Sequence, residues 1–118
     1  MAVKRYQDFI VWQKSMELVI DVYRLVRLLP DYEKYALGDQ MRRAAVSIPS
    51  NIAEGNSRFS NKDFKHFLFI SRGSVSELET QLNICTHLNY INEVDTEKSR
   101  NLCIEVGRLL NALINSMK

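Results

Sequence analysis

Apolar residues recur at intervals of three and four along most of the chain, which is the spacing of one face of an α-helix. In the first segment, two apolar stripes run beside each other. They consist of Phe9, Trp12, Met16, Val19, Tyr23 and Val26, and of Val11, Leu18, Val22, Leu25 and Leu29. Pro30 and Asp31 follow, and they predict the end of the first helix, with Asp31 able to cap the next element.

Three more segments repeat the helical spacing. The second carries Leu37, Met41, Ala44, Ala45, Ile48 and Ile52 on one face. Its end at Gly55-Asn56 is typical of a left-handed C-terminal cap. The third begins at "SNKD" (60–63), where Ser60 suits the N-cap, and it runs to about Asn89. The fourth follows a loop in which Asp95 is the expected cap, and its apolar positions continue to Met117.

Four long helices without a convincing strand predict an all-α fold in one domain over residues 1–118. The connections are short, so consecutive helices are expected to be antiparallel neighbours. The architecture predicted is an antiparallel up-down-up-down four-helix bundle.

The apolar surface exceeds what one core requires, because the first helix has two stripes and the last helix has a wide one. A soluble monomer rarely exposes such a surplus. Self-association into a homo-oligomer is therefore expected. A small monomeric bundle with a broad core is the alternative.

The run "QMRRAAVSIPSNIAEG" (40–55) places Pro49 inside the second helix. Proline cannot donate a backbone hydrogen bond to Ala45, and its ring crowds that carbonyl. We expect a helix bent at Pro49, in which Ser47, Ser50 and Asn51 bond the freed backbone groups. Two short helices meeting at Pro49 are the alternative.

A polar stripe accompanies the apolar face of the second helix. It consists of Gln40, Arg43, Ser47, Asn51 and Glu54, and the third helix has a matching set in Ser71, Ser74, Glu77 and Gln81. An antiparallel pairing of the two helices places Arg43 near Ser74 and Glu77, and Glu54 near Lys62 and Lys65. We therefore predict a partly buried Arg43–Glu77 network.

Charge is concentrated in the middle of the chain. The whole sequence has 16 basic and 14 acidic side chains, whereas residues 40–75 have a clear basic excess. Arg58, Lys62 and Lys65 cluster around the second turn, and Phe59 beside them is able to stack on a base. Arg42 points away from Arg43 and completes the candidate nucleic-acid-binding set. The alternative is that these charges only solubilise the turn while Phe59 covers the core.

Other chemistry is not indicated. His66 and His87 are far apart in sequence, no phosphate-binding loop is present, and no nucleophile lies in an elbow motif. We predict no catalytic, cofactor or metal site, and hence no enzyme. Cys85 and Cys103 are expected to be core thiols. No apolar run suits a membrane span or a secretory signal, so the cytosol is the expected location.

The motifs "QMRRAAVSIPSNIAEG" and "SRGSVSELETQL" (71–82) resemble the signature of the four-helix-bundle proteins encoded in intervening sequences of bacterial 23S ribosomal RNA genes. The resemblance implies ring-shaped homopentamers without enzymatic activity, for which nucleic-acid binding is the usual suggestion. Accessory proteins of diversity-generating retroelements are similar, although they are more strongly basic. A protein-binding scaffold and a reverse-transcriptase accessory factor are therefore the alternative functions.

Overall fold

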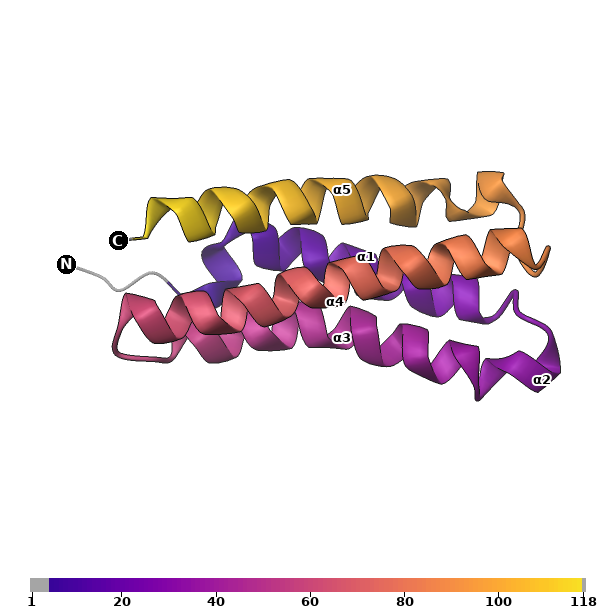
Figure 1. Cartoon of the computed structure of the whole chain (residues 1–118), viewed down its shortest axis with the longest axis horizontal. Helices are drawn as coiled ribbons and strands as arrows, with labels where there is room; N and C mark the ends of the chain where they lie inside the picture. The colour runs from indigo at the N-terminus through magenta and orange to yellow at the C-terminus, as the bar shows by residue number, and fades with distance from the viewer. Residues whose placement is uncertain (1–4, 118) are drawn as a thin grey trace.

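The computed structural model describes residues 5–117, and within them every regular element is helical. A short 3-10 helix, η1 (Tyr6–Asp8), precedes α1 (Ile10–Val26). The one-turn helix α2 (Asp31–Lys34) leads into α3 (Leu37–Asn56), and α4 (Asn61–His87) and α5 (Glu93–Ser116) complete the chain (Figure 1). The predicted all-α fold is confirmed.

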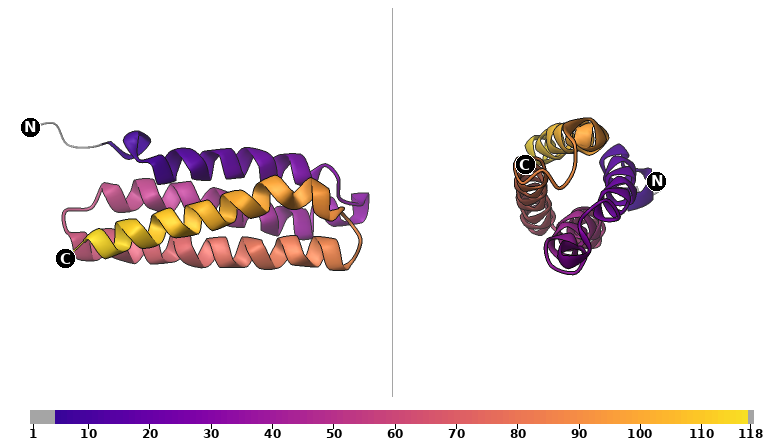
Figure 2. Two further views of the ribbon diagram at one scale, coloured as in Figure 1. Left: turned by 90° about the horizontal axis from the view of Figure 1, so that it is seen from above. Right: turned by 90° about the vertical axis from the view of Figure 1, so that its right-hand side faces the viewer.

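The four long helices form an elongated bundle with extents of 50 × 23 × 20 Å. Each runs antiparallel to the next, and the end-on view in Figure 2 places α1, α3, α4 and α5 in order around a square. Because short connections join helices on adjacent corners, the topology is the predicted up-down-up-down arrangement. α1 and α4 lie across one diagonal of the square.

The two apolar stripes on α1 are buried to different extents. Leu18, Val22 and Leu25 are fully buried between the helices, whereas Trp12, Met16 and Val19 are half-buried and Tyr23 is exposed. The second stripe lies at the edge of the core: Val26 is buried, and Phe9, Trp12 and Val19 pack against the core while part of each side chain stays exposed.

Ser60 begins α4 as predicted, and its hydroxyl accepts the backbone N–H of Asp63 at 3.2 Å. The predictions that Asp31 and Asp95 are helix N-caps are wrong. Pro30 and Asn92 occupy the N-cap positions of α2 and α5, and Asp31 and Asp95 fall in the first turns of those helices. An acidic side chain in the first turn still interacts favourably with the helix dipole, which is why both positions are compatible with a carboxylate.

The left-handed cap predicted at Gly55-Asn56 is also wrong. Among residues 5–117 only Asn89 has a positive φ, at 59°. It closes α4 in a Schellman arrangement, in which the N–H of Tyr90 bonds Cys85 O at 2.9 Å and that of Asn89 bonds Thr86 O at 3.1 Å. Gly55 has a different role: a Cβ there would lie 2.8 Å from Phe64 Cδ1, so glycine lets α3 and α4 approach closely.

Helix α3 is continuous through Pro49, so the alternative of two separate short helices is not observed. Side chains bond carbonyls just before the proline. Asn51 Nδ2 donates to Ser47 O at 2.8 Å, and Ser71 Oγ of α4 donates to Ile48 O at 2.9 Å. The bend itself stays a prediction.

The Arg43–Glu77 network is not formed. Both side chains are exposed, and neither takes part in an ion pair within the described residues. The small members of the polar stripes meet instead, with Ser74 Oγ donating to Ser47 Oγ at 2.9 Å. Arg43 lies one turn from Ser47, and Glu77 lies one turn from Ser74. At both positions, and at Gln40 two turns from Ser47, the side chain is exposed to solvent.

Candidate nucleic-acid interface

The turn between α3 and α4 and the first half of α4 are basic. Four basic residues and one acidic residue lie between positions 58 and 72. Because α4 starts just after Ser60, helical spacing brings Lys62, Lys65, His66 and Phe69 to one outward side. These four residues line a surface groove of about 350 Å³, which we call the α4 basic groove.

The two lysines of this groove are available to an external anion. Neither Lys62 nor Lys65 forms an ion pair with any described residue. Glu54, which was predicted to lie near these lysines, pairs with Arg58 four residues along instead, at 2.7 Å. A groove with two uncompensated ammonium groups therefore opens beside the turn.

Phe59 projects from the tip of the turn and is fully exposed, at 110% relative accessibility. The alternative in which Phe59 covers the core is therefore wrong. An aromatic ring with both faces in water is a suitable surface for stacking an unpaired base.

Two arginines near the groove are committed to intramolecular contacts. Arg58 pairs with Glu54 and lies 4.7 Å over the ring of Phe67. Arg72 lies 4.9 Å over the ring of Phe69 and donates to Asn111 Oδ1 at 3.0 Å. Their guanidinium groups add positive potential at the groove and hold the aromatic rings in place.

Arg42 does not belong to this site. It pairs with Asp39, donates to Lys34 O at 3.1 Å, and lies 6.0 Å from the ring centroids of Tyr23 and Tyr35. Its side chain is only 23% exposed. The expectation that Arg42 is free to bind a ligand is therefore wrong. Arg42 holds α2 against α3. It precedes Arg58 by 16 residues, which corresponds to about 24 Å along a helix.

The predicted site residues did not include two that line the groove, His66 and Phe69, nor Arg72, which lies over the ring of Phe69. The signal was present, since these residues follow Lys62 and Lys65 at steps of three and four within a predicted helix.

A buried carboxylate on α1 was not predicted either. Asp21 is 4% exposed, accepts Arg24 Nε at 2.8 Å and accepts the hydroxyl of buried Ser99 on α5 at 2.6 Å. Burial raises the pKa of Asp21, but the hydrogen bonds from Arg24 and Ser99 and the charge of Arg24 outweigh it and leave the pKa below its ordinary value. This triad joins α1 to α5 and is structural, far from the basic groove.

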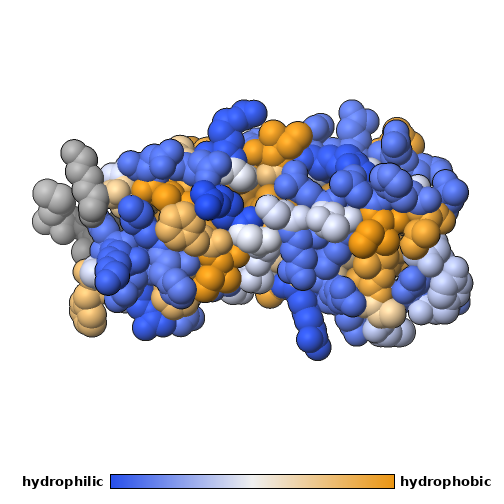
Figure 3. Space-filling model, viewed as in Figure 1, coloured by the Kyte–Doolittle hydropathy of each residue, from blue (hydrophilic) through white to orange (hydrophobic). Residues whose placement is uncertain are grey.

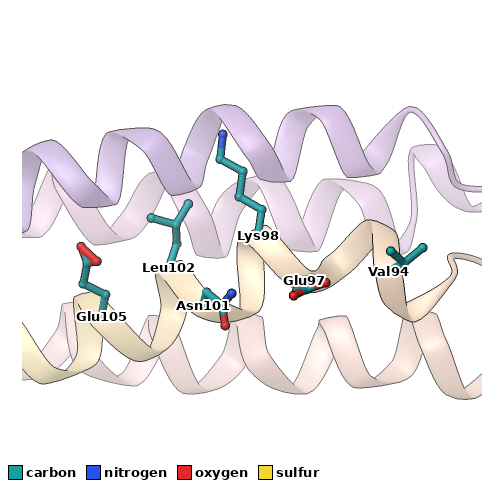
Figure 4. Close-up of a pocket in the computed structure, with 6 residues that line it drawn as sticks. All are labelled: Val94, Glu97, Lys98, Asn101, Leu102 and Glu105. Carbon is teal, nitrogen blue, oxygen red and sulfur yellow. The ribbon is translucent and has the colours of Figure 1, made fainter.

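The remaining surface features give little basis for catalysis. The groove in Figure 4, about 480 Å³, is lined by α5 residues alone: Val94, Glu97, Lys98, Asn101, Leu102 and Glu105. It contains no nucleophile next to a base. Within the described residues, no cluster of three His, Cys, Asp or Glu side chains is placed to hold a metal ion.

Cys85 and Cys103 are buried free thiols, as predicted for core positions. Burial is the main cause that raises the pKa of Cys85 to about 11 and that of Cys103 to about 12. Both thiols therefore stay protonated and unreactive at neutral pH. No helix in the described part of the chain combines the length and apolarity that a membrane crossing demands.

The comparisons with known proteins agree with the bundle. Residues 7–112 match the model of the family described as 23S rRNA-intervening sequence protein. A crystal structure of a protein of unknown function from the S23 ribosomal protein family of Bacteroides thetaiotaomicron is similar, with a TM-score of 0.82 and 27% identity over 89% of this chain and 98% of that one. None of the curated proteins matches. The chain therefore belongs to the family of 23S rRNA-intervening sequence proteins.

Proposed function

We propose that this protein is a self-assembling, non-enzymatic bundle that binds RNA through the α4 basic groove and Phe59. The observation that carries the proposal is the pair of uncompensated lysines, Lys62 and Lys65, next to a fully exposed aromatic ring. Ammonium groups of this kind bind phosphate oxygens by releasing counterions, and the ring stacks on a base.

Single-stranded RNA fits this site better than a duplex. Phe59 stacks only on a base that is unpaired and accessible, and the groove is a shallow surface feature that follows one side of α4. The lysines contact the backbone and give no sequence specificity by themselves.

Self-assembly is supported by the apolar side chains that the protomer leaves in water. Ile20 is 68% exposed, and Tyr23, Val46 and Ile104 are also exposed. The family resemblance implies a ring of five copies. In such an assembly, several weak grooves act on one RNA molecule, so a protomer of net charge +2 binds more tightly than one groove would allow.

The RNA-binding proposal predicts that neutralising the two lysines weakens binding. Fluorescence anisotropy with a labelled oligouridylate of about 20 nucleotides in about 50 mM salt measures the affinity. We expect Lys62→Gln/Lys65→Gln to bind about tenfold more weakly and to reduce the salt slope by about two. Phe59→Ala is expected to weaken binding of the single strand and to leave duplex RNA unaffected.

The control is Arg43→Gln/Lys98→Gln, which removes the same charge from two exposed positions away from the groove. It should bind nearly as well as the wild type. Equal loss in both double variants would show that only net charge matters. Absence of binding by the wild type at low salt would refute the proposal.

A protein-binding scaffold is the second candidate, and one observation favours it. Tyr32 and Tyr35, at the opposite end of the bundle from the basic groove, are 74% and 82% exposed. Exposed tyrosines are enriched at protein interfaces. This function requires no RNA binding, and the anisotropy measurement therefore separates the two.

A further inference from the structure

Two faces on opposite sides of the bundle lack a partner within the protomer. α1 packs against α3 and α5, and α4 packs against the same two helices, so α1 and α4 occupy diagonal corners in the end-on view (Figure 2). Their outward faces therefore point in opposite directions.

The outward face of α1 combines apolar side chains with arginines. Val19, Ile20 and Tyr23, together with Arg24 and Arg27, line a groove of about 550 Å³ on this helix. Arg27 is exposed and forms no ion pair with the described residues. We call Val19, Ile20, Tyr23 and Arg27 the α1 ridge.

The outward face of α4 has a glycine at its centre. Gly73 lies in the middle of a long helix, where glycine is less stable than alanine. A Cβ at this position would meet no atom within 4 Å, so nothing inside the protomer requires a glycine there. Ile70 and Ile84 are exposed on the same helix, and Glu77, one turn from Gly73, forms no ion pair within the described residues.

We call Ile70, Gly73, Glu77 and Ile84 the α4 seat. Figure 3 shows this side of the molecule, where α4 runs in front of α1, and apolar patches are separated there by hydrophilic side chains.

We propose that the α1 ridge of one copy of this chain packs onto the α4 seat of a second copy. The inference rests on the proposed self-assembly and identifies the surfaces that it uses. The missing side chain at Gly73 allows close approach, and the two isoleucines flank the contact with apolar surface. Arg27 and Glu77 bring opposite, uncompensated charges to the two sides.

The contact is head-to-tail. Each copy that uses its ridge keeps a free seat on the opposite side, so the contact repeats and closes into a ring when the rotation between copies allows it. A contact of ridge with ridge would stop at a dimer. In the head-to-tail arrangement, a substitution on either the ridge or the seat prevents assembly. In a ridge-to-ridge dimer, only a substitution on the ridge does so.

The test uses one lysine substitution on each face. Gly73→Lys places a bulky charge in the seat, and Ile20→Lys places one in the ridge, at a side chain that is 68% exposed. Gly107→Lys is the matched control, because Gly107 also lies in a long helix and a Cβ there also meets nothing within 4 Å. Light scattering gives the mass of each variant, and circular dichroism gives its thermal midpoint.

We expect Gly107→Lys to assemble like the wild type. Gly73→Lys and Ile20→Lys should each remain at the chain mass of 13.7 kDa, with a helical spectrum that shows folded protomers. When these two variants are mixed, the intact ridge of the first binds the intact seat of the second. The mixture should therefore contain a particle of twice the chain mass, which neither variant forms alone.

Each other outcome overturns the inference. A Gly73→Lys protein that assembles shows that the seat is not used, and the proposed self-assembly then stands without it. Loss of assembly in Gly107→Lys shows that the effect is not specific to the seat. A mixture without the doubled mass excludes the head-to-tail contact. A wild-type protein at 13.7 kDa refutes the self-assembly proposal together with this inference.

Discussion

Replacing Asp21 by alanine is expected to lower the free energy of unfolding by about 3 kcal/mol. The substitution leaves the hydroxyl of Ser99, which is fully buried, without its acceptor, and it removes the partner of Arg24. It also breaks the Ser99–Asp21 hydrogen bond that links α5 to α1, and it removes the carboxylate that positions Arg24 for its bond to Asp95 O at 2.8 Å. Urea unfolding followed by circular dichroism measures the loss.

Glu17→Ala is the control on the same helix. Glu17 also pairs with a basic side chain, Lys14, but both are at least a third exposed, so their ion pair contributes little. We expect a change within about 0.5 kcal/mol for this variant. Equal effects of the two substitutions would show that burial of the Asp21 triad adds nothing to stability.

The same triad predicts a dependence on pH. The pKa of Asp21 is lower in the folded protein than the ordinary value of 3.8, so the folded state binds the proton less readily than the unfolded state. The stabilisation is therefore complete well above pH 3.8 and is lost as the pH falls through the folded pKa. In urea titrations, the difference between wild type and Asp21→Ala should stay constant near neutral pH and shrink below about pH 4.

The sequence was most informative where the determining interactions are local. Apolar spacing located all four long helices, because the period of a helix is set by its own backbone. Ser60 was recognised as a cap because its partner, the N–H of Asp63, is three residues away. Asn92 and Asp95 are both good cap residues in one loop, and the choice between them depends on how the loop crosses from α4 to α5.

Interactions between elements were harder to predict. The polar stripes of α3 and α4 do meet, at Ser47 and Ser74. Whether Arg43 and Glu77 also meet depends on how far each helix is rotated about its own axis, and in the structure both side chains are exposed. For the candidate site, the lysines were identified from local charge, and Phe59 from its aromatic ring beside them. The engagement of Arg42 was not, although its ion pair with Asp39, one turn earlier on α3, is a local signal. Its other partner, Lys34 O, is on α2, whose position against α3 is a tertiary property.

Gly55 is the clearest case of a residue whose role depends on tertiary contact, and it gives the last prediction. We expect Gly55→Ala to destabilise the protein by about 2 kcal/mol, although alanine is the better helix former. The new methyl group would lie 2.9 Å from Phe67 Cβ and 3.2 Å from the backbone oxygen of Phe64. Neither atom belongs to a flexible side-chain end, so α3 and α4 must move apart.

Gly107→Ala is the matched substitution, since its methyl group would enter open space on α5. Here the helix propensity of alanine acts alone, and a gain of up to about 1 kcal/mol is expected. The same glycine-to-alanine change should thus lower the urea midpoint at Gly55 and raise it at Gly107. If Gly55→Ala also stabilised the protein, the close approach of α3 and α4 at this position would be wrong, because a helix pair in that contact has no room for a methyl group.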